Sequence, residues 1–188
     1  MFPLFETIAI ENGKIQNIER HQARYERSLR AMYGKSAVVF HELFSLITPP
    51  TELQQGLVHC RIDYNATQCQ AQYFPYQRKT YRTFQPVVCN HIDYGLKYSD
   101  RTLLNELFAQ RGTCDEIIII KNGLVTDCSI GNLILRQGDQ WFTPDSPLLR
   151  GTQREKLLAE GKIIERKILA ENLPHFEEIR LINAMNGL

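Results

Sequence analysis

A hairpin signal in the second half of the chain constrains the fold more than any other feature of the sequence. The strand-forming run 117–121 leads into Asn122-Gly123, and a second such run follows over 124–127. Asn-Gly favours a type I′ turn, whose backbone twist matches that of two antiparallel strands. The sequence therefore predicts antiparallel β-structure here. A second strand pair is predicted over residues 133–136 and 141–143.

A long amphipathic helix is predicted in the first half of the chain. Apolar residues recur at helical spacing from about Glu19 to Tyr33, and Gly34 follows where a left-handed residue commonly ends a helix. Strand-forming stretches lie on both sides of it, so the sequence indicates a mixed α/β (α+β) fold. The other predicted strands are 5–10, 15–18, 57–64, 68–74, 87–92, 163–169 and 179–184, and the shorter helical segments are 40–47 and 173–178.

The predicted elements form two groups joined by a polar, basic linker at 75–86. We expect a small N-terminal α/β lobe over 1–80 and a larger C-terminal lobe over 81–188, and 188 residues suffice for two small cores. A net charge of +1 gives no electrostatic reason to expect nucleic acid as a partner. No apolar run reaches membrane-spanning length, and no signal peptide is recognisable.

The cysteines and histidines indicate neither disulfides nor a metal site. Five cysteines are an odd number, and none forms a C-x-x-C pair. This pattern favours reduced thiols in a cytoplasmic protein. The histidines are scattered along the chain, so we predict no metal.

Lys97 is the first candidate for chemistry. It stands just before a predicted helix, with Ser99 and Asp100 as N-cap candidates and Gly112 as the helix end. An amine on such a rigid mount is well placed to attack a carbonyl group. Most lysines before helices are simply solvated, and the spacing alone leaves both interpretations open.

A second group of candidates lies later in the chain. The pattern from Thr152 to Glu155 predicts a capping box, and a helix N-terminus there could hold a phosphate or merely be capped. Asp127 ends a predicted hairpin strand before the polar turn 128–132. It could hold a protonated ring nitrogen, or it could only form the turn.

Two arginines complete the candidates from the residues themselves. Arg24, in the pattern His21-x-x-Arg24, could reach a phosphate from the first helix, although a solvated helix face would explain it equally well. Arg61 lies among alternating apolar residues, so it faces either a cavity or solvent.

The order of these segments resembles the class-IV aminotransferase family of pyridoxal-phosphate enzymes, which includes branched-chain and D-amino-acid aminotransferases and aminodeoxychorismate lyase. The match spans nearly the whole chain. Its segments are Phe5-Glu6-Thr7, His21-x-x-Arg24, Lys97-x-x-Asp100-Arg101, Asp115-Glu116, Asn122-Gly123-x-Val125-Thr126-Asp127-x-Ser129-x-x-Asn132, Thr143-Pro144, Leu149-x-Gly151-x-x-Arg154 and Asn183-Ala184.

The resemblance implies pyridoxal 5′-phosphate as cofactor, bound between the two lobes of a homodimeric enzyme. Lys97 would be the internal Schiff-base lysine and proton shuttle, and Asp127 would take the place of the family's glutamate on the pyridine nitrogen. The phosphate contacts implied are Arg24, Ser129, Ile130, Thr152 and Gln153, and the substrate contacts are Phe5, Arg61, Asn183 and Ala184.

The sequence also departs from the family pattern. Asp127 is one methylene shorter than glutamate, Asp100 replaces an asparagine, and Thr152-Gln153 replaces Ile-Thr. The match also implies a two-lobed fold of the D-amino-acid aminotransferase type that is shortened at both ends. We expect transamination between an amino acid and a 2-oxo acid. The alternatives are aminodeoxychorismate lyase, which eliminates pyruvate, and a non-catalytic protein that binds the cofactor.

Overall fold

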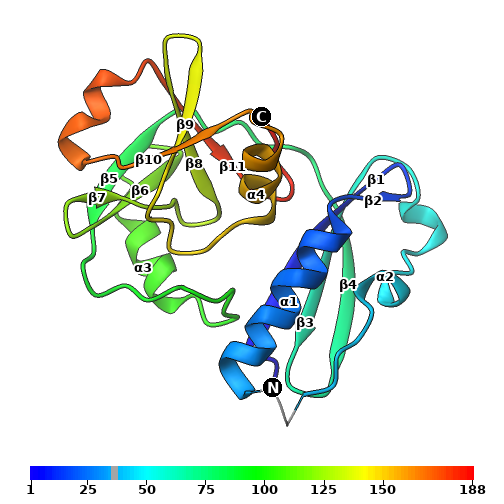
Figure 1. Ribbon diagram of the computed structural model, residues 1–188. Coiled ribbons are helices and arrows are strands. Elements are labelled where there is room, and N and C mark those ends of the chain that lie inside the picture. Colours follow the sequence, from blue (N-terminus) through cyan, green and yellow to red (C-terminus); the bar gives the residue numbers. More distant parts are fainter. Residues whose placement is uncertain (35–37) are drawn as a thin grey trace. The chain divides into compact units, whose positions relative to one another are not determined.

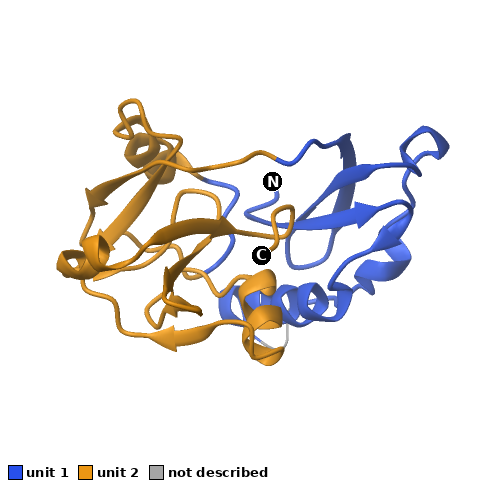
Figure 2. Cartoon of the chain, turned by 90° about the horizontal axis from the view of Figure 1, so that it is seen from above, with its two compact units in different colours: residues 1–78, 96–100 blue, residues 79–95, 101–188 orange. Residues whose placement is uncertain are grey.

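The computed structural model describes residues 1–34 and 38–188 (Figure 1). By contacts the chain forms two compact units (Figure 2). Unit 1 comprises Met1–Arg78 and Leu96–Asp100, and unit 2 comprises Lys79–Gly95 and Arg101–Leu188. Both contain helices and strands, so the predicted mixed α/β fold class is confirmed.

Unit 1 is built on a four-stranded antiparallel sheet in the order β2-β1-β3-β4. The first hairpin turns at Asn12 and Gly13, which both have positive φ, as a tight turn requires. The predicted strands 5–10, 57–64 and 68–74 are present. The strands are β1 (Leu4–Glu11), β2 (Lys14–Ile15), β3 (Leu57–Tyr64) and β4 (Cys69–Pro75).

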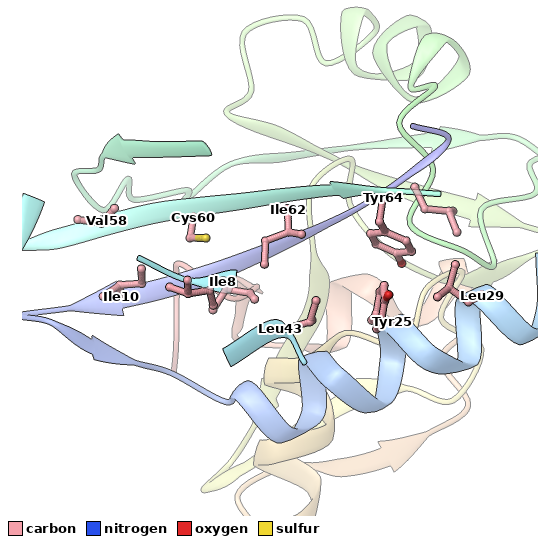
Figure 3. Close-up of a cluster of buried hydrophobic side chains, with 11 residues drawn as sticks. Ile8, Ile10, Tyr25, Leu29, Leu43, Val58, Cys60, Ile62 and Tyr64 are labelled. Carbon is pink, nitrogen blue, oxygen red and sulfur yellow. The ribbon is translucent and has the colours of Figure 1, made fainter. Parts of the chain in front are cut away.

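Helix α1 (Ile18–Tyr33) covers one face of this sheet and encloses the core of unit 1 (Figure 3). Every second residue of β3 is buried, from Val58 to Tyr64, as expected of a strand with one face on a core. Tyr25 and Leu29 of α1 are fully buried against these side chains. The predicted helix 40–47 is only the short α2 (Leu43–Leu46), followed by the 3₁₀ turn η1 (Thr51–Leu53).

The segment that carries Lys97 belongs to unit 1, whereas we had placed this lysine in the C-terminal lobe. The reason is main-chain hydrogen bonding with the start of the chain. The Phe5 amide donates to the Lys97 carbonyl at 3.1 Å, and the Ser99 amide donates to the Pro3 carbonyl at 2.8 Å. Lys97 is therefore mounted on the β1 strand rather than on the helix that follows it.

Unit 2 contains two sheets, of order β5-β6-β7 and β10-β9-β8-β11. The predicted Asn-Gly hairpin is confirmed, because Asn122 and Gly123 have φ of 52° and 76°. The predicted strand 87–92 is instead 84–88, since this stretch pairs in parallel with β6. The strands are β5 (Phe84–Val88), β6 (Glu116–Lys121), β7 (Leu124–Val125), β8 (Asn132–Gln137), β9 (Gln140–Pro144), β10 (Ile164–Arg166) and β11 (Glu178–Ile182).

The helices of unit 2 do not begin where their sequence signals predicted, since α3 starts later than expected and α4 one residue earlier. Helix α3 (Thr102–Ala109) has Arg101 as N-cap, so neither Ser99 nor Asp100 caps it. Helix α4 (Thr152–Ala159) has Gly151 as N-cap. Thr152 is thus already helical and the predicted capping box is wrong. A short 3₁₀ helix, η2 (Ala170–His175), replaces the helical segment predicted at 173–178.

Candidate active site

The residues predicted to form a site are divided between the two units. Unit 1 carries Phe5, Arg24, Arg61 and Lys97. Unit 2 carries Asp127, Ser129, Ile130, Thr152, Gln153, Asn183 and Ala184.

In unit 1, three of the four predicted residues meet at one aromatic ring. The Lys97 Nζ lies 4.5 Å from the centroid of the Phe5 ring, and the Arg61 Cζ lies 4.0 Å from it. Both contacts are within cation–π range. Arg61 also donates to both carboxylate oxygens of Asp63, at 2.8 and 2.6 Å. This pairing helps to hold the guanidinium over the Phe5 ring, so that lysine, arginine and ring lie together in unit 1.

His59 belongs to the same face of β3 as Arg61, because the two residues are two positions apart on a strand. Its Nε2 is buried and has no hydrogen-bond partner among the residues that the structure describes. Burial, together with the positive charges of Arg61 and Lys97, lowers the pKa of His59. The sequence analysis missed this residue, although the spacing His59-x-Arg61 was a signal for it.

Arg24 has its contacts in the core of unit 1. Its Nε donates to Glu6 Oε1 at 2.8 Å and its Nη2 to Glu6 Oε2 at 2.5 Å, while His21 Nδ1 lies 2.7 Å from Oε2. Phe5 and Glu6 are consecutive in β1 and so point to opposite faces of the sheet. Glu6 and its partner Arg24 therefore approach β1 from the face opposite to the Phe5 side chain, although the charge of Lys97 still contributes to the lowered pKa of His21.

The charge of Glu6 is fully compensated by these partners. Burial alone would raise its pKa, but Arg24 and His21 more than offset that effect and lower the pKa to about 2. Burial also lowers the pKa of His21, which favours a neutral ring. Glu6 was part of the sequence pattern, yet its partnership with Arg24 was not foreseen.

In unit 2, Asp127 is a buried acid with two neutral partners. Asn132 Nδ2 donates to its Oδ1 at 2.8 Å, and the Leu149 amide donates to its Oδ2 at 2.9 Å. Burial raises the pKa of Asp127 to about 7, although these two hydrogen bonds act in the opposite direction. A carboxyl group of this kind can share a proton with a basic nitrogen near neutral pH.

The turn after Asp127 is fixed by two further side chains. Ser129 Oγ donates to Glu116 Oε2 at 2.8 Å, and Arg101 Nη2 donates to the Ser129 carbonyl at 2.8 Å. The Ile130 carbonyl accepts from Asn183 Nδ2 at 3.2 Å. Ile130, predicted to contact the phosphate, and Asn183, predicted to contact the substrate, thus meet at this turn. Ala184 lies next to Asn183 in the turn that precedes Met185.

Asn132 joins the Asp127 carboxyl to the start of helix α4. Its Oδ1 accepts from the Gly151 amide at 3.1 Å, immediately before Thr152 and Gln153. A helix N-terminus carries a partial positive charge and is a common binding site for phosphate. Asn132 belonged to the quoted sequence pattern, but no role had been predicted for it.

Within residues 1–34 and 38–188, no group of three or more metal-ligating side chains is found. None of the described helices is both long enough and apolar enough to cross a membrane.

A mounted lysine, a buried acid and a helix N-terminus are the groups that enzymes using pyridoxal phosphate require of their protein. The comparison with protein families agrees with this class. Residues 94–188, about half of the chain, match the family described as Amino-transferase class IV. The chain belongs to this family of pyridoxal-phosphate-dependent enzymes, so the family predicted from the sequence is confirmed.

The chain is also similar to individual proteins. An uncharacterized protein of Haemophilus influenzae is 71% identical over 188 residues, which is all of both chains. A solved structure from Haemophilus somnus, named a putative 4-amino-4-deoxychorismate lyase, is 60% identical, covers 100% of this chain and 98% of its own, and has a TM-score of 0.96. A hypothetical aminotransferase from Mycobacterium tuberculosis, solved with PLP bound, has a TM-score of 0.78 and 16% identity, and covers 99% of this chain and 78% of its own. At that identity it shows the fold alone.

Proposed function

We propose that the protein is a pyridoxal-phosphate-dependent enzyme that acts on a small acid bearing an amino group, with Lys97 as the residue that binds the cofactor aldehyde. The observation that carries this proposal is the Asp127 carboxyl, buried without a cationic partner within hydrogen-bonding distance and linked through Asn132 to the start of α4. This arrangement matches the two ends of the cofactor, a basic ring nitrogen and a phosphate.

The donor set of unit 2 fits the cofactor chemically. A protonated pyridine nitrogen beside Asp127 would compensate its charge and so lower the raised pKa of this carboxyl. The α4 N-terminus, including Thr152 and Gln153, suits a dianionic phosphate. The Ser129-Ile130 turn is proposed as a further phosphate contact. Arg24 is proposed as another, although two of its donors already bind Glu6.

The residues of unit 1 supply the acid–base chemistry and the substrate contacts in this proposal. When bound, pyridoxal phosphate withdraws electrons from the amino-bearing carbon of the substrate. The Lys97 amine would hold the cofactor aldehyde and, when free, would accept the proton from that carbon. Phe5 and Arg61 hold the substrate, and Arg61 attracts a carboxylate. Asn183 and Ala184 of unit 2 are proposed as further substrate contacts.

The reaction that we favour is cleavage of 4-amino-4-deoxychorismate with release of pyruvate. The reason is the protein from Haemophilus somnus, which is 60% identical over essentially its full length and carries that name. The sequence alone favoured transamination, with the lyase as the alternative. Transamination stays the second candidate because the family itself is described by that reaction. The homodimer and the cytoplasmic location stay predictions from the sequence.

The test begins with the cofactor. Purified protein is mixed with pyridoxal phosphate, and the absorbance of lysine-bound cofactor is recorded for wild type, Lys97→Ala and Lys14→Ala. Lys14 is an exposed lysine of unit 1 and serves as the matched control. We expect the band in wild type and Lys14→Ala only. A wild type without the band, or a Lys97→Ala variant that retains it, would contradict the proposal.

The reaction is then tested with wild-type protein carrying the cofactor. Given 4-amino-4-deoxychorismate, the lyase should form 4-aminobenzoate and pyruvate in equal amounts. A panel of amino acids should leave the cofactor spectrum unchanged. Conversion to the amine form of the cofactor by any amino acid, without pyruvate formation from 4-amino-4-deoxychorismate, would instead establish transamination.

A further inference from the structure

The side-chain amide of Asn132 makes hydrogen bonds through both its nitrogen and its oxygen within unit 2. Both of its N–H directions are occupied, because Nδ2 donates to Asp127 Oδ1 and to the Leu149 carbonyl, each at 2.8 Å. Its Oδ1 accepts from the Gly151 amide at 3.1 Å. The side chain is only 4% exposed, so water cannot readily replace these partners.

Gly151 leaves the space that this amide needs. Its backbone is extended, with φ −74° and ψ 143°, so the conformation itself does not require glycine. A Cβ at this position would, however, come within 2.1 Å of Asn132 Oδ1. Glycine is therefore required because the amide approaches the main chain closely just before helix α4 begins.

A closed loop of hydrogen bonds results. The Leu149 main chain donates to Asp127 and accepts from Asn132, while Asn132 binds Asp127 directly. With the Gly151 amide also bound to Asn132, the Asp127 carboxyl cannot shift relative to residues 149–151, which lead into α4, without breaking at least one of these bonds. Side chains held in this way fix the geometry of a binding site more precisely than a single contact does.

We propose that Asn132 is a positioning residue that sets the separation between the Asp127 carboxyl and the α4 N-terminus, so that one ligand can engage both. This inference rests on the proposed function and extends it, because there Asn132 only links the two groups, whereas here it fixes their separation and Gly151 makes room for it. The ligand it suits has a cationic ring nitrogen at one end and a phosphate at the other.

The test compares three probes, namely pyridoxal phosphate, pyridoxal without phosphate, and inorganic phosphate. Their affinities are measured by titration for wild type, Asn132→Ala and the control Asn105→Ala, an exposed asparagine of α3. A positioning role matters only to a ligand that reaches both ends. Asn132→Ala should lower the affinity for pyridoxal phosphate by about tenfold or more. It should lower the affinity for pyridoxal and for inorganic phosphate, which each reach one end only, by about twofold. Equal losses for all three probes, or no loss, would overturn the inference.

A double-mutant cycle tests the Asn132–Gly151 contact itself. In the wild-type background, Gly151→Ala should strongly lower the affinity for pyridoxal phosphate. In the Asn132→Ala background the same substitution should lower it less, because the oxygen that the new Cβ would meet is absent. Additive losses would contradict the contact.

A measurement on cofactor-free protein distinguishes a lost hydrogen bond from a variant that fails to fold. In cofactor-free protein, ¹³C NMR of the carboxyl groups should show a higher pKa for Asp127 in Asn132→Ala, provided that thermal unfolding confirms a folded variant. An unchanged pKa of Asp127 would overturn the inference. A wild type that fails to bind pyridoxal phosphate would instead overturn the proposed function, while the NMR result would still test the hydrogen bond.

Discussion

Each unit buries at least one carboxyl group, and Glu6 of unit 1 and Asp127 of unit 2 behave in opposite ways. Glu6 of unit 1 is 0% exposed and Asp127 of unit 2 is 5% exposed, yet the pKa of Glu6 is lowered to about 2 and that of Asp127 is raised to about 7. Burial acts in the same direction on both. The difference lies in the partners, since Glu6 contacts the Arg24 guanidinium whereas Asp127 accepts hydrogen bonds from neutral groups.

The comparison indicates which of the two carboxyl groups would be stabilised by a cationic ligand. Glu6 has an internal cation and gains little from another one. The charge of Arg154 only partly offsets the burial of Asp127, so its anion stays unfavourable until a further cation binds, and ligand sites are often locally destabilising in this way. We therefore regard Glu6 as a structural acid and Asp127 as a functional one.

The largest effect is expected for Asp127→Asn in the loaded enzyme. Activity should fall by about 10³-fold, because a neutral amide cannot hold the charge on the ring nitrogen. In cofactor-free protein the same variant should change how stability depends on pH. The folded protein binds the Asp127 proton more tightly than the unfolded chain does. This carboxyl therefore favours folding below pH about 4 and opposes it as the pH rises through about 7.

Urea unfolding of cofactor-free protein from pH 4 to pH 8 measures this dependence. Over that range the free energy of unfolding should fall by about 4 kcal/mol more in wild type than in Asp127→Asn. This figure follows from the difference between the ordinary pKa of 3.8 and the raised pKa of about 7. Parallel curves for the two proteins would show that Asp127 is not the functional acid we describe.

Removing the cation from Glu6 tests the other side of the comparison. Arg24→Met should destabilise cofactor-free protein by about 3–5 kcal/mol, because it leaves a buried carboxylate without its charge partner. The control is Arg27→Met, which removes an exposed arginine from the same helix and should cost less than about 1 kcal/mol. Thermal or urea unfolding measures both, and equal costs would refute the role of the pair.

Acid should destabilise unit 1 through Glu6. Because folded Glu6 releases its proton more readily than the unfolded chain, its contribution is complete above pH about 4.5 and is lost as the pH falls toward about 2. The loss should amount to about 3 kcal/mol and should be missing in Glu6→Gln, which is destabilised at all pH values. A Glu6→Gln variant with the same acid-dependent loss as wild type would exclude Glu6 as its source.

The smallest effect is expected at Ser129. Ser129→Ala removes the hydroxyl that donates to Glu116, whose pKa is already raised by burial. The Ser129 amide still contacts Glu116 at 3.3 Å, so the cost should be about 1 kcal/mol of stability. Urea unfolding at pH 7 measures it. A cost above about 3 kcal/mol would mean that this turn, rather than Asp127, dominates the stability of the region.

The sequence was most informative where local chemistry decides the structure. The Asn122-Gly123 hairpin and the helix near 19–33 were predictable, because turn geometry and apolar periodicity act over a few residues. The helix starts were misplaced, since Ser99 and Thr152 look like caps but lie outside the cap positions that tertiary packing selects. Asp127 and Lys97 could be identified as candidates from residue type and order.

Their partners could not be predicted in the same way. Glu6 and Arg24 are 18 residues apart, and Asn132 meets Gly151 19 residues later, so these contacts depend on how strands and helices pack. The placement of Lys97 on β1 depends on a main-chain contact between residues more than 90 positions apart. Such long-range contacts leave no local signal in the residues that make them.

The main-chain contact of Lys97 with Phe5 has a consequence for dissecting the molecule. The polypeptide leaves unit 1 after Arg78, returns for five residues at Leu96–Asp100, and leaves again. A fragment of residues 79–188 would carry the lysine but lack the strand on which it is mounted. A fragment of residues 1–78 would lack the lysine. Co-expression of the two pieces, rather than either alone, is the route by which a split version of this protein could regain Lys97 in its place beside Phe5.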